Sequence, residues 1–262
     1  MKWVDIGINL TNKRFDSDRD QVIASALAAG VDKLIITGTN LAESKKALQI
    51  ASSDIDGLYC TAGCHPHDAG SFSNEALNEI SAIAEEPEVV AIGECGLDFN
   101  RDFSPRHQQI NAFERQLELA VKLQKPVFLH ERDAFDTQYQ ILKDYIPKLK
   151  GGVAHCFTGT IEAMEAYLEL GLSIGITGWI CDERRGQALY DMVHLIPDNR
   201  LMIETDGPYL TPRDLRPKPK DGRNEPKYLP HIGEAVARAR EQSLHQVAEN
   251  SYNNSCKLFN LE

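Results

Sequence analysis

The residues of this sequence best suited to chemistry are two carboxylates and two histidines, each at the end of a different apolar segment: Glu94, His130, His155 and Asp206. Taken singly, a histidine at a strand end is more often a hydrogen-bonded structural residue, and a buried glutamate can simply pair with an arginine. Buried charged groups need a partner or a metal, however, because their desolvation costs several kcal/mol. Imidazole and carboxylate together suit Zn, Mn, Fe or Mg and are typical of catalytic sites. The four residues together therefore predict a catalytic metal site.

Other residues at or near the strand ends also need an interpretation, among them two more histidines and two cysteines. The segment Cys64–Asp68 adds His65 and His67 at the end of another apolar run. Cys95 and Cys156 directly follow ligand candidates, so strand alternation should point them away from the site. We expect both to be small buried packing residues rather than metal ligands.

Four such side chains can meet only if the fold brings the ends of several strands together. Short apolar segments with the continuous hydrophobicity of strands buried on both faces recur along the chain. They are Val4–Leu10, Lys33–Thr39, Leu58–Cys64, Val89–Asp98, Pro126–Arg132, Gly152–Gly159, Leu172–Ile180 and Leu201–Leu210. Amphipathic segments that read as helices separate them, namely Asp16–Ala29, Leu41–Ala51, Asn74–Glu86, Pro105–Gln124, Ala134–Tyr145, Thr160–Leu170 and Arg184–Leu195.

Alternating strands and helices imply parallel strands, and eight of them favour a closed (β/α)8 TIM barrel of the metallo-dependent hydrolase type. A doubly wound open sheet is the alternative fold. The absence of repeats and linkers indicates a single domain over residues 1–262. The helical tail from Pro230 to Glu262 should complete the outer layer of the barrel. In such barrels the catalytic groups lie at the C-terminal ends of the strands, where the four residues fall.

Composition limits the location and the partners of the protein. The net charge of −11 argues against a protein that coats nucleic acid through bulk electrostatics, but not against an enzyme that binds phosphates locally. We read no signal peptide and no membrane span, and the six cysteines show no CxxC pair. We therefore expect a cytoplasmic protein with reduced thiols and no membrane contact, and a monomer.

Six ordered segments of the sequence resemble those of the TatD-type metal-dependent deoxyribonucleases. They are Ala62–Asp68, Ala91–Asp98, Pro126–His130, His155–Gly159, Ile203–Leu210 and Arg223–Pro226, and their spacing fits the family over essentially the whole chain. The resemblance implies a TIM-barrel hydrolase of phosphodiester bonds, with DNA repair as its setting. It further implies that Glu94, His130 and His155 bind a divalent metal. Asp206 would be a ligand or the base that activates water, and His65 would lie near the metal and the substrate phosphate.

One departure from the family pattern bears on the metal. Most members open the first strand with a His-x-His pair, and here these positions are Gly7 and Asn9. Neither replaces imidazole well, which weakens the case for a tightly held two-metal site. The change is similar to that in the subgroup described as magnesium-dependent 3′–5′ exonucleases on single-stranded DNA and RNA. Fewer nitrogen ligands favour Mg²⁺, with Zn²⁺ or Mn²⁺ as alternatives.

Substrate binding is predicted in the basic loop after the last apolar segment, through Arg213, Arg216, Lys218 and Arg223. A solvated surface loop is an equally good interpretation of these residues. Trp179 could stack on a base or belong to the core.

Two other function classes remain open on the sequence. One is an amidohydrolase-type enzyme acting on a small amide or lactone, because fold does not fix function. The other is a non-catalytic barrel that binds nucleic acid and whose metal site has decayed, as Gly7 and Asn9 would suggest.

Overall fold

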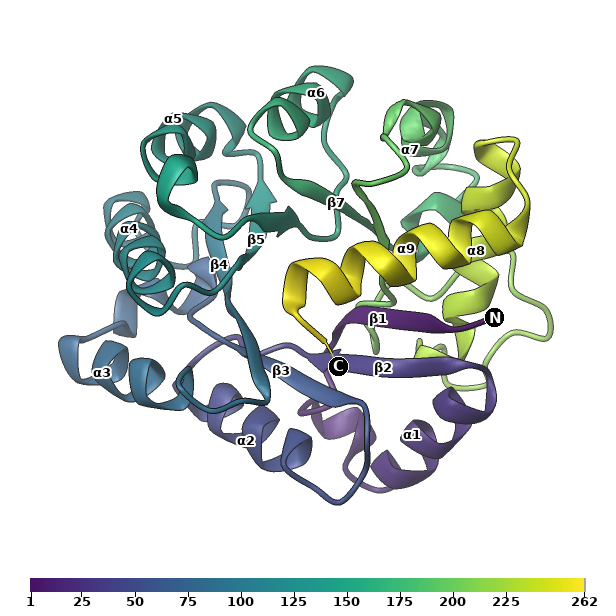
Figure 1. Ribbon diagram of the computed structural model, residues 1–262, viewed down its shortest axis with the longest axis horizontal. Coiled ribbons are helices and arrows are strands. Elements are labelled where there is room, and N and C mark those ends of the chain that lie inside the picture. Colours follow the sequence, from purple (N-terminus) through teal and green to yellow (C-terminus); the bar gives the residue numbers. More distant parts are fainter. Residues whose placement is uncertain (262) are drawn as a thin grey trace.

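The strands form one parallel sheet whose order follows the sequence from β1 to β8, in a computed structural model that describes residues 1–261 (Figure 1). Each strand pairs in parallel with the next. The strands are β1 (Trp3–Ile8), β2 (Val31–Ile36), β3 (Leu58–Ala62), β4 (Val89–Asp98), β5 (Val127–Arg132), β6 (Gly152–Ala154), β7 (Ser173–Ile176) and β8 (Leu201–Ile203).

The sheet closes on itself through the residues that follow β8. The backbone N–H of Asp206 donates to the carbonyl of Gly7 at 2.8 Å, and the N–H of Asn9 donates to the carbonyl of Gly207 at 2.8 Å. This seam joins the two ends of the strand order, so the predicted (β/α)8 barrel is confirmed and the open sheet was wrong.

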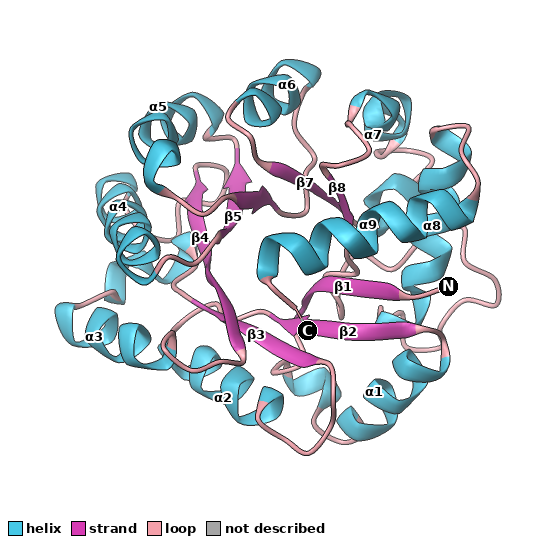
Figure 2. Cartoon of the chain, viewed as in Figure 1, coloured by secondary structure: helices cyan, strands magenta, loops and turns pink. Residues whose placement is uncertain are grey.

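Helices surround the barrel and alternate with the strands (Figure 2). They are α1 (Arg19–Ala28), α2 (Leu41–Ala51), α3 (Asn74–Ile83), α4 (Arg106–Leu123), α5 (Phe135–Tyr145), α6 (Ile161–Glu169), α7 (Gln187–Met192), α8 (Leu229–Ala239) and α9 (Leu244–Phe259). Short 3-10 helices lie between them: η1 (Lys13–Phe15), η2 (Pro66–Ser71), η3 (Ile146–Lys148), η4 (Gly178–Cys181), η5 (Val193–Leu195) and η6 (Pro226–Tyr228). No helix within residues 1–261 has the length and hydropathy needed to span a bilayer.

The C-terminal tail was predicted to complete the outer layer of helices, and only part of it does so. It forms two helices, and only α8 joins that layer. The second, α9, lies across the N-terminal end of the barrel (Figure 1). There the Tyr252 hydroxyl donates to Asp32 at the start of β2, and the Asn254 amide donates to the carbonyl of Leu201 at the start of β8. Helix α9 therefore closes the end of the barrel opposite to the predicted site.

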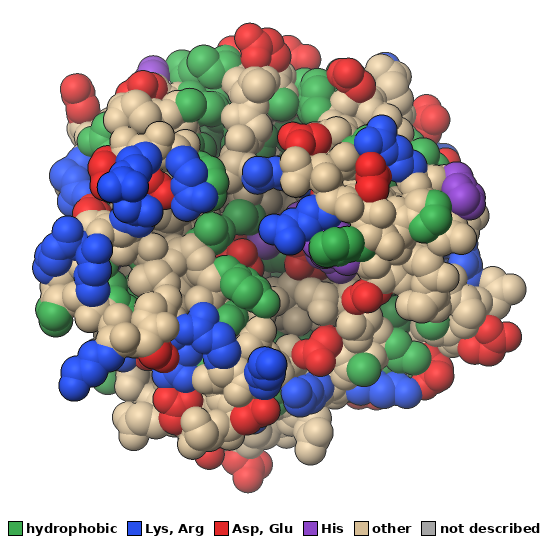
Figure 3. All heavy atoms as spheres, turned by 180° about the vertical axis from the view of Figure 1, so that it is seen from behind, with side chains coloured by type: hydrophobic (Ala, Val, Ile, Leu, Met, Phe, Trp, Pro, Cys, Tyr) green, Lys and Arg blue, Asp and Glu red, His purple; other side chains and the backbone are tan. Residues whose placement is uncertain are grey.

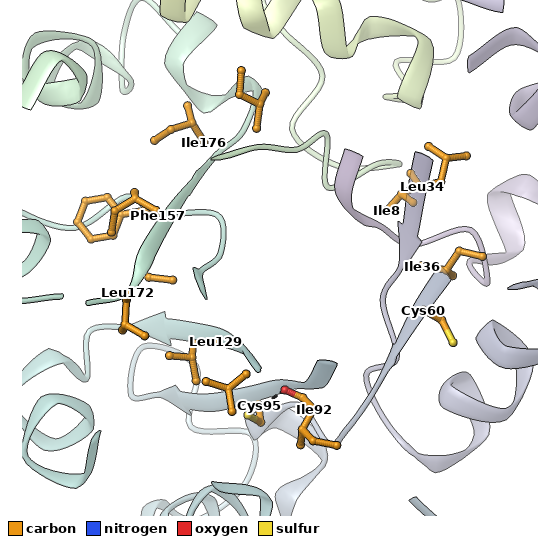
Figure 4. Close-up of a cluster of buried hydrophobic side chains, with 14 of the residues drawn as sticks. Ile8, Leu34, Ile36, Cys60, Ile92, Cys95, Leu129, Phe157, Leu172 and Ile176 are labelled. Carbon is orange, nitrogen blue, oxygen red and sulfur yellow. Dashed lines mark hydrogen bonds between the residues drawn. The ribbon is translucent and has the colours of Figure 1, made fainter. Parts of the chain in front are cut away.

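Apolar side chains fill two layers. The barrel interior holds one cluster: Val4, Ile6, Ile35, Val90, Ala91, Phe128, Val153, Met202, Phe259 and Leu261. A larger cluster lies between the strands and the surrounding helices, and Figure 4 shows part of it, including Ile92, Leu129 and Leu172. Cys95 belongs to this outer layer and is fully buried, as predicted. All six cysteines are free.

Several strands end earlier than the apolar pattern suggested. Strand β6 ends at Ala154 and β8 at Ile203, so His155 and Asp206 lie just beyond their strands. Cys156 and Asp206 have φ values of 47° and 52°, in the left-handed region that regular strands exclude. Hydrophobicity continues past these points because residues that follow the strands, such as Phe157 and Pro208, are buried, and burial alone does not reveal where strand geometry stops.

Candidate metal centre

Glu94, on β4, lies at the centre of a cluster of imidazoles. Its Oε1 is 2.9 Å from His130 Nδ1 and 3.0 Å from His155 Nε2, both at hydrogen-bonding distance, and 3.5 Å from His65 Nε2. Burial opposes ionisation, but the imidazoles of His155 and His65 hold the pKa of Glu94 well below its usual range. The structure thus places three of the four predicted ligands in direct contact and adds His65 to them.

His155 is held from its other side by Glu204. The Nδ1 of His155 is 2.9 Å from Glu204 Oε2. Burial alone would lower the pKa of His155, but the carboxylates of Glu204 and Glu94 outweigh it and hold the pKa well above its ordinary value. Gly7 and Gly175 make room for the Glu204 carboxylate, because a Cβ at either position would be 2.3 Å or 2.5 Å from its oxygens. Glu204 therefore fixes the orientation of the His155 ring, as carboxylates do for metal-binding histidines.

Asp206 faces the same cavity from the closing seam of the barrel. Its Oδ1 accepts a hydrogen bond from the amide of Asn9 at 2.9 Å. Burial, together with the nearby charges of Glu94 and Glu204, raises the pKa of Asp206 to about 7 although His155 acts against this. Asn9, at one of the positions where the family pattern has histidine, thus orients the carboxylate of Asp206.

A second carboxylate, Asp98, reaches the cluster from the end of β4. Its Oδ2 is 2.7 Å from His67 Nε2 and 3.5 Å from His130 Nε2. Its Oδ1 accepts from the backbone N–H groups of Asn100 and Arg101. Burial opposes ionisation of Asp98, but the contacts with His130, with the N–H of Arg101 and with His67 hold its pKa well below the usual range. Asp98 therefore orients His67 from an ionised state.

The residues fit a divalent cation. One ligand atom from each of His65, Glu94 and His130 lies within 4.8 Å of the others, a spacing that one ion can bridge. The Nε2 atom of His130 is buried without a hydrogen-bond partner among the described residues, which is the condition of a nitrogen free to act as a ligand. Mixed imidazole and carboxylate donors suit a catalytic ion with exchangeable positions.

The cluster forms the floor of a cavity of about 470 Å³ at the C-terminal ends of the strands. Figure 3 shows this face, with histidine and acidic side chains in a central hollow and basic side chains around it. Besides the cluster, the lining includes Asn9, Thr39, Asp68, Arg101, Phe103, Glu131, Arg132, Cys156, Thr158, Trp179, Asp206, Tyr209 and Leu210.

The four basic residues predicted to bind substrate are absent from this lining among the described residues, and the arginines present there are Arg101 and Arg132. Arg223 is 7% exposed, and its guanidinium donates to Asp18, to Glu225 and to the carbonyl of Arg14. These contacts tie the end of the loop to the start of α1. The guanidinium of Arg223 is therefore occupied by contacts within the protein, and its contact with substrate stays a prediction.

Arg213, Arg216 and Lys218 lie on the outer part of the same loop. Arg213 Nε is 3.6 Å from Asp182 Oδ1, and Arg216 Nη1 donates to the carbonyls of Arg213 and Leu215. Cys156 departs from the outward position we predicted, because it lies beyond the end of β6 and lines the cavity. Strand alternation no longer applies once the backbone leaves strand geometry.

Sequence reasoning also omitted Glu204, Asp98 and His67 from the proposed ligands and catalytic groups. Glu204 and Asp98 stand at strand ends beside residues that were selected, and they hold histidines rather than facing the cavity centre. Their separation from the partner histidine, 49 residues for Glu204 and His155, leaves no local pattern that links them.

A (β/α)8 barrel with a histidine–carboxylate cluster at the C-terminal strand ends defines the class of metallo-dependent hydrolases. A model of the family described as TatD related DNase matches residues 4–260, and the chain belongs to that family.

Named relatives and solved structures cover nearly the whole chain. A protein of Pantoea ananatis named 3′-5′ ssDNA/RNA exonuclease TatD is 51% identical over 98% of this chain and 99% of its own length. A protein of the same name from Erwinia billingiae is 52% identical, over 98% of each chain. The crystal structure of a TatD homologue from Escherichia coli K12 matches with a TM-score of 0.90 and 28% identity, over 99% of this chain and 98% of its own.

Proposed function

We propose that this protein is a metal-dependent 3′–5′ exonuclease that hydrolyses single-stranded DNA and RNA. The observation that carries the proposal is the histidine–carboxylate cluster at the floor of a cavity whose mouth presents aromatic rings and arginines. The name shared by the relatives that are about half identical over nearly the full chain supports the polarity and the substrate.

We assign the metal to Glu94, His130 and His155, with Asp206 as a ligand or as the base. Mg²⁺ is the ion we favour, and Zn²⁺ or Mn²⁺ are alternatives, because Gly7 and Asn9 offer no imidazole. A divalent ion bound here would supply Lewis acidity to a phosphoryl oxygen and lower the pKa of a water molecule.

The chain's own residues supply the proton transfer and the positioning. Asp206 accepts the proton of the attacking water, since it lines the cavity and Asn9 binds its Oδ1. His65 is 3.5 Å from Glu94 and steadies the scissile phosphate as charge develops on it. Glu204 keeps the His155 ring in place throughout.

The cavity mouth suits a single strand rather than a duplex. Phe103 is 65% exposed and Tyr209 52% exposed, and Trp179 lines the same cavity. An aromatic ring can stack on a base only when the base has left its own duplex stack, and such stacking tolerates any sequence. These rings therefore favour unpaired nucleotides of either sugar type.

We place the rest of the bound nucleic-acid strand in a second cavity next to the first. A second cavity of about 620 Å³ shares Glu131, Arg132, Thr158 and Trp179 with the first, and it also reaches Arg185. Arg101 and Arg132 are the arginines that the first cavity offers to the phosphates. Contacts with more distant phosphates are assigned to Arg213, Arg216 and Lys218 on the outer loop.

We propose that residues 1–262 act as a single barrel domain, as a monomer in the cytoplasm, in DNA repair.

The test uses single-stranded DNA and RNA oligonucleotides labelled at the 5′ or the 3′ end, with Mg²⁺, Mn²⁺ or Zn²⁺ added to metal-free protein. We expect stepwise shortening from the 3′ end with 5′-labelled substrate, and a loss of more than about 100-fold in Glu94→Gln with an unchanged circular dichroism spectrum. Full turnover in Glu94→Gln, or hydrolysis only of a parallel panel of amides and lactones, would overturn the proposal.

A further inference from the structure

A second group of metal-binding side chains lies outside the cavity. It consists of Cys181 at the end of η4, Asp214 in the loop after β8, and His231 in the first turns of α8. One ligand atom from each lies within 4.8 Å of the other two, and His231 Nε2 is 2.7 Å from Asp214 Oδ1. We propose that Cys181, Asp214 and His231 form a second metal site that binds a thiophilic divalent cation such as Zn²⁺.

The donor atoms define the ion. One sulfur, one imidazole nitrogen and one carboxylate oxygen form a set that suits Zn²⁺, whereas Mg²⁺ prefers oxygen ligands alone. Binding converts the Cys181 thiol to a thiolate as the sulfur–metal bond forms, and the proton leaves to solvent. The site therefore differs in chemistry from the cluster around Glu94, which contains no sulfur.

The surroundings suit a bound ion. The two oxygens of Asp214 contact different residues. Oδ2 is 3.5 Å from Arg238 Nη2, and Oδ1 is 2.7 Å from His231 Nε2. The other ring nitrogen of His231 is 3.8 Å from Glu234 Oε2, which places a further carboxylate beside the ring without a hydrogen bond to it. A cavity of about 200 Å³ is lined in part by Cys181 and Asp214, which leaves room for a water molecule beside a bound ion.

The proposed second site has one buried ligand and one exposed ligand. Cys181 is 6% exposed, which protects the sulfur, whereas the side chain of Asp214 is 41% exposed and gives an ion a route from solvent. The three ligands come from segments that are far apart in sequence, so the ion would join the long loop after β8 to η4 and α8. That loop carries Arg213 and Arg216, next to Asp214 in the chain.

Cobalt replaces zinc in the decisive experiment, because a cobalt–thiolate bond gives a charge-transfer band in the near ultraviolet. Metal-free protein is titrated with Co²⁺ in the presence of excess Mg²⁺. We expect the band in wild type and in Glu94→Gln, its loss in Cys181→Ser, and its retention in Cys256→Ser, a control at a partly exposed cysteine outside this group. Zn²⁺ titrated by calorimetry should then compete with the cobalt.

His231→Gln provides a second variant, since the His231 side chain is partly exposed and its loss leaves the core intact. We expect its Zn²⁺ affinity to fall by about 10-fold or more, and Zn²⁺ to raise the melting temperature of Glu94→Gln but not of the Glu94→Gln/His231→Gln double variant. A wild type without the band, a band that persists in Cys181→Ser, or unchanged Zn²⁺ affinity in His231→Gln would each overturn the site. These readouts do not involve nuclease activity, so they stand apart from the proposed function.

Discussion

Glu204 Oε2 lies where a side chain on Gly7 would begin, since a Cβ there would be only 2.3 Å away. The same oxygen is 2.9 Å from His155 Nδ1. The absence of a side chain at residue 7 and the orientation of a proposed metal ligand are therefore parts of one arrangement. The departure from the family's His-x-His pattern does not by itself indicate a decayed site.

Glu204→Gln should weaken metal binding rather than the chemical step. The amide cannot match the carboxylate that orients His155, so we expect metal affinity to fall about 10–100-fold. Turnover should recover at saturating Mg²⁺, which a metal titration of the nuclease assay would measure. Glu183→Gln, on an exposed side chain, is the matched control. Equal activity of Glu204→Gln and wild type at limiting metal would remove Glu204 from the site.

Gly7→Ala should act through the same contact. The added methyl must push the flexible end of Glu204 away from His155, and we expect metal affinity to drop by about 10-fold. Because both substitutions break one interaction, the Gly7→Ala/Glu204→Gln double variant should bind metal no more weakly than Glu204→Gln alone. Strictly additive losses would show that the two residues act independently.

Phe103→Ala and Trp179→Ala should weaken the binding of single strands. Loss of one stacked base costs about 1–3 kcal/mol, so we expect Kd for a short oligonucleotide to rise about 5- to 150-fold. Fluorescence anisotropy in a Glu94→Gln background measures this without cleavage. Tyr145→Ala, on α5 and outside the cavity lining, is the control. If Kd is unchanged in both variants, these rings do not stack on the substrate.

Arg223→Ala should reduce stability and leave the chemistry intact. Removal of the guanidinium leaves Asp18 without its hydrogen-bond partner and Glu225 with Lys227 alone, and we expect the free energy of unfolding to fall by about 3 kcal/mol. Denaturant unfolding measures the loss, and activity per folded molecule should remain near that of wild type. Arg216→Ala, exposed on the same loop, should keep its stability. A stable Arg223→Ala variant that binds DNA poorly would restore Arg223 to the substrate contacts.

The sequence predicted the barrel because each strand is buried on both faces and therefore forms a continuous apolar segment. It also predicted that Glu94, His130 and His155 would meet, since parallel strands in a closed barrel carry their C-terminal ends to one face. The bounds of β4 were predicted residue for residue, because Asp98 marks the change from apolar to polar.

What the sequence could not predict depends on contacts between distant residues. Nothing near Arg223 in the chain indicates that Asp18 will meet it, so a structural arginine and a substrate-binding one look alike. The ring orientation of His155 depends on Glu204 through space. We expected helix α9 among the outer helices, but it covers the N-terminal end of the barrel. Amphipathicity shows that a helix buries one face, but it does not show which element that face packs against.

The seam between β1 and the residues after β8 should determine how the enzyme loses activity as the denaturant concentration rises. The backbone of Asp206 is held by the carbonyl of Gly7, and its carboxylate by the amide of Asn9. A barrel that opens locally at this seam would misplace Asp206 while most strands and helices persist, because local opening costs less than global unfolding. Activity would then fade at lower denaturant concentrations than the helical signal, and the proposed base would serve as a reporter of barrel closure.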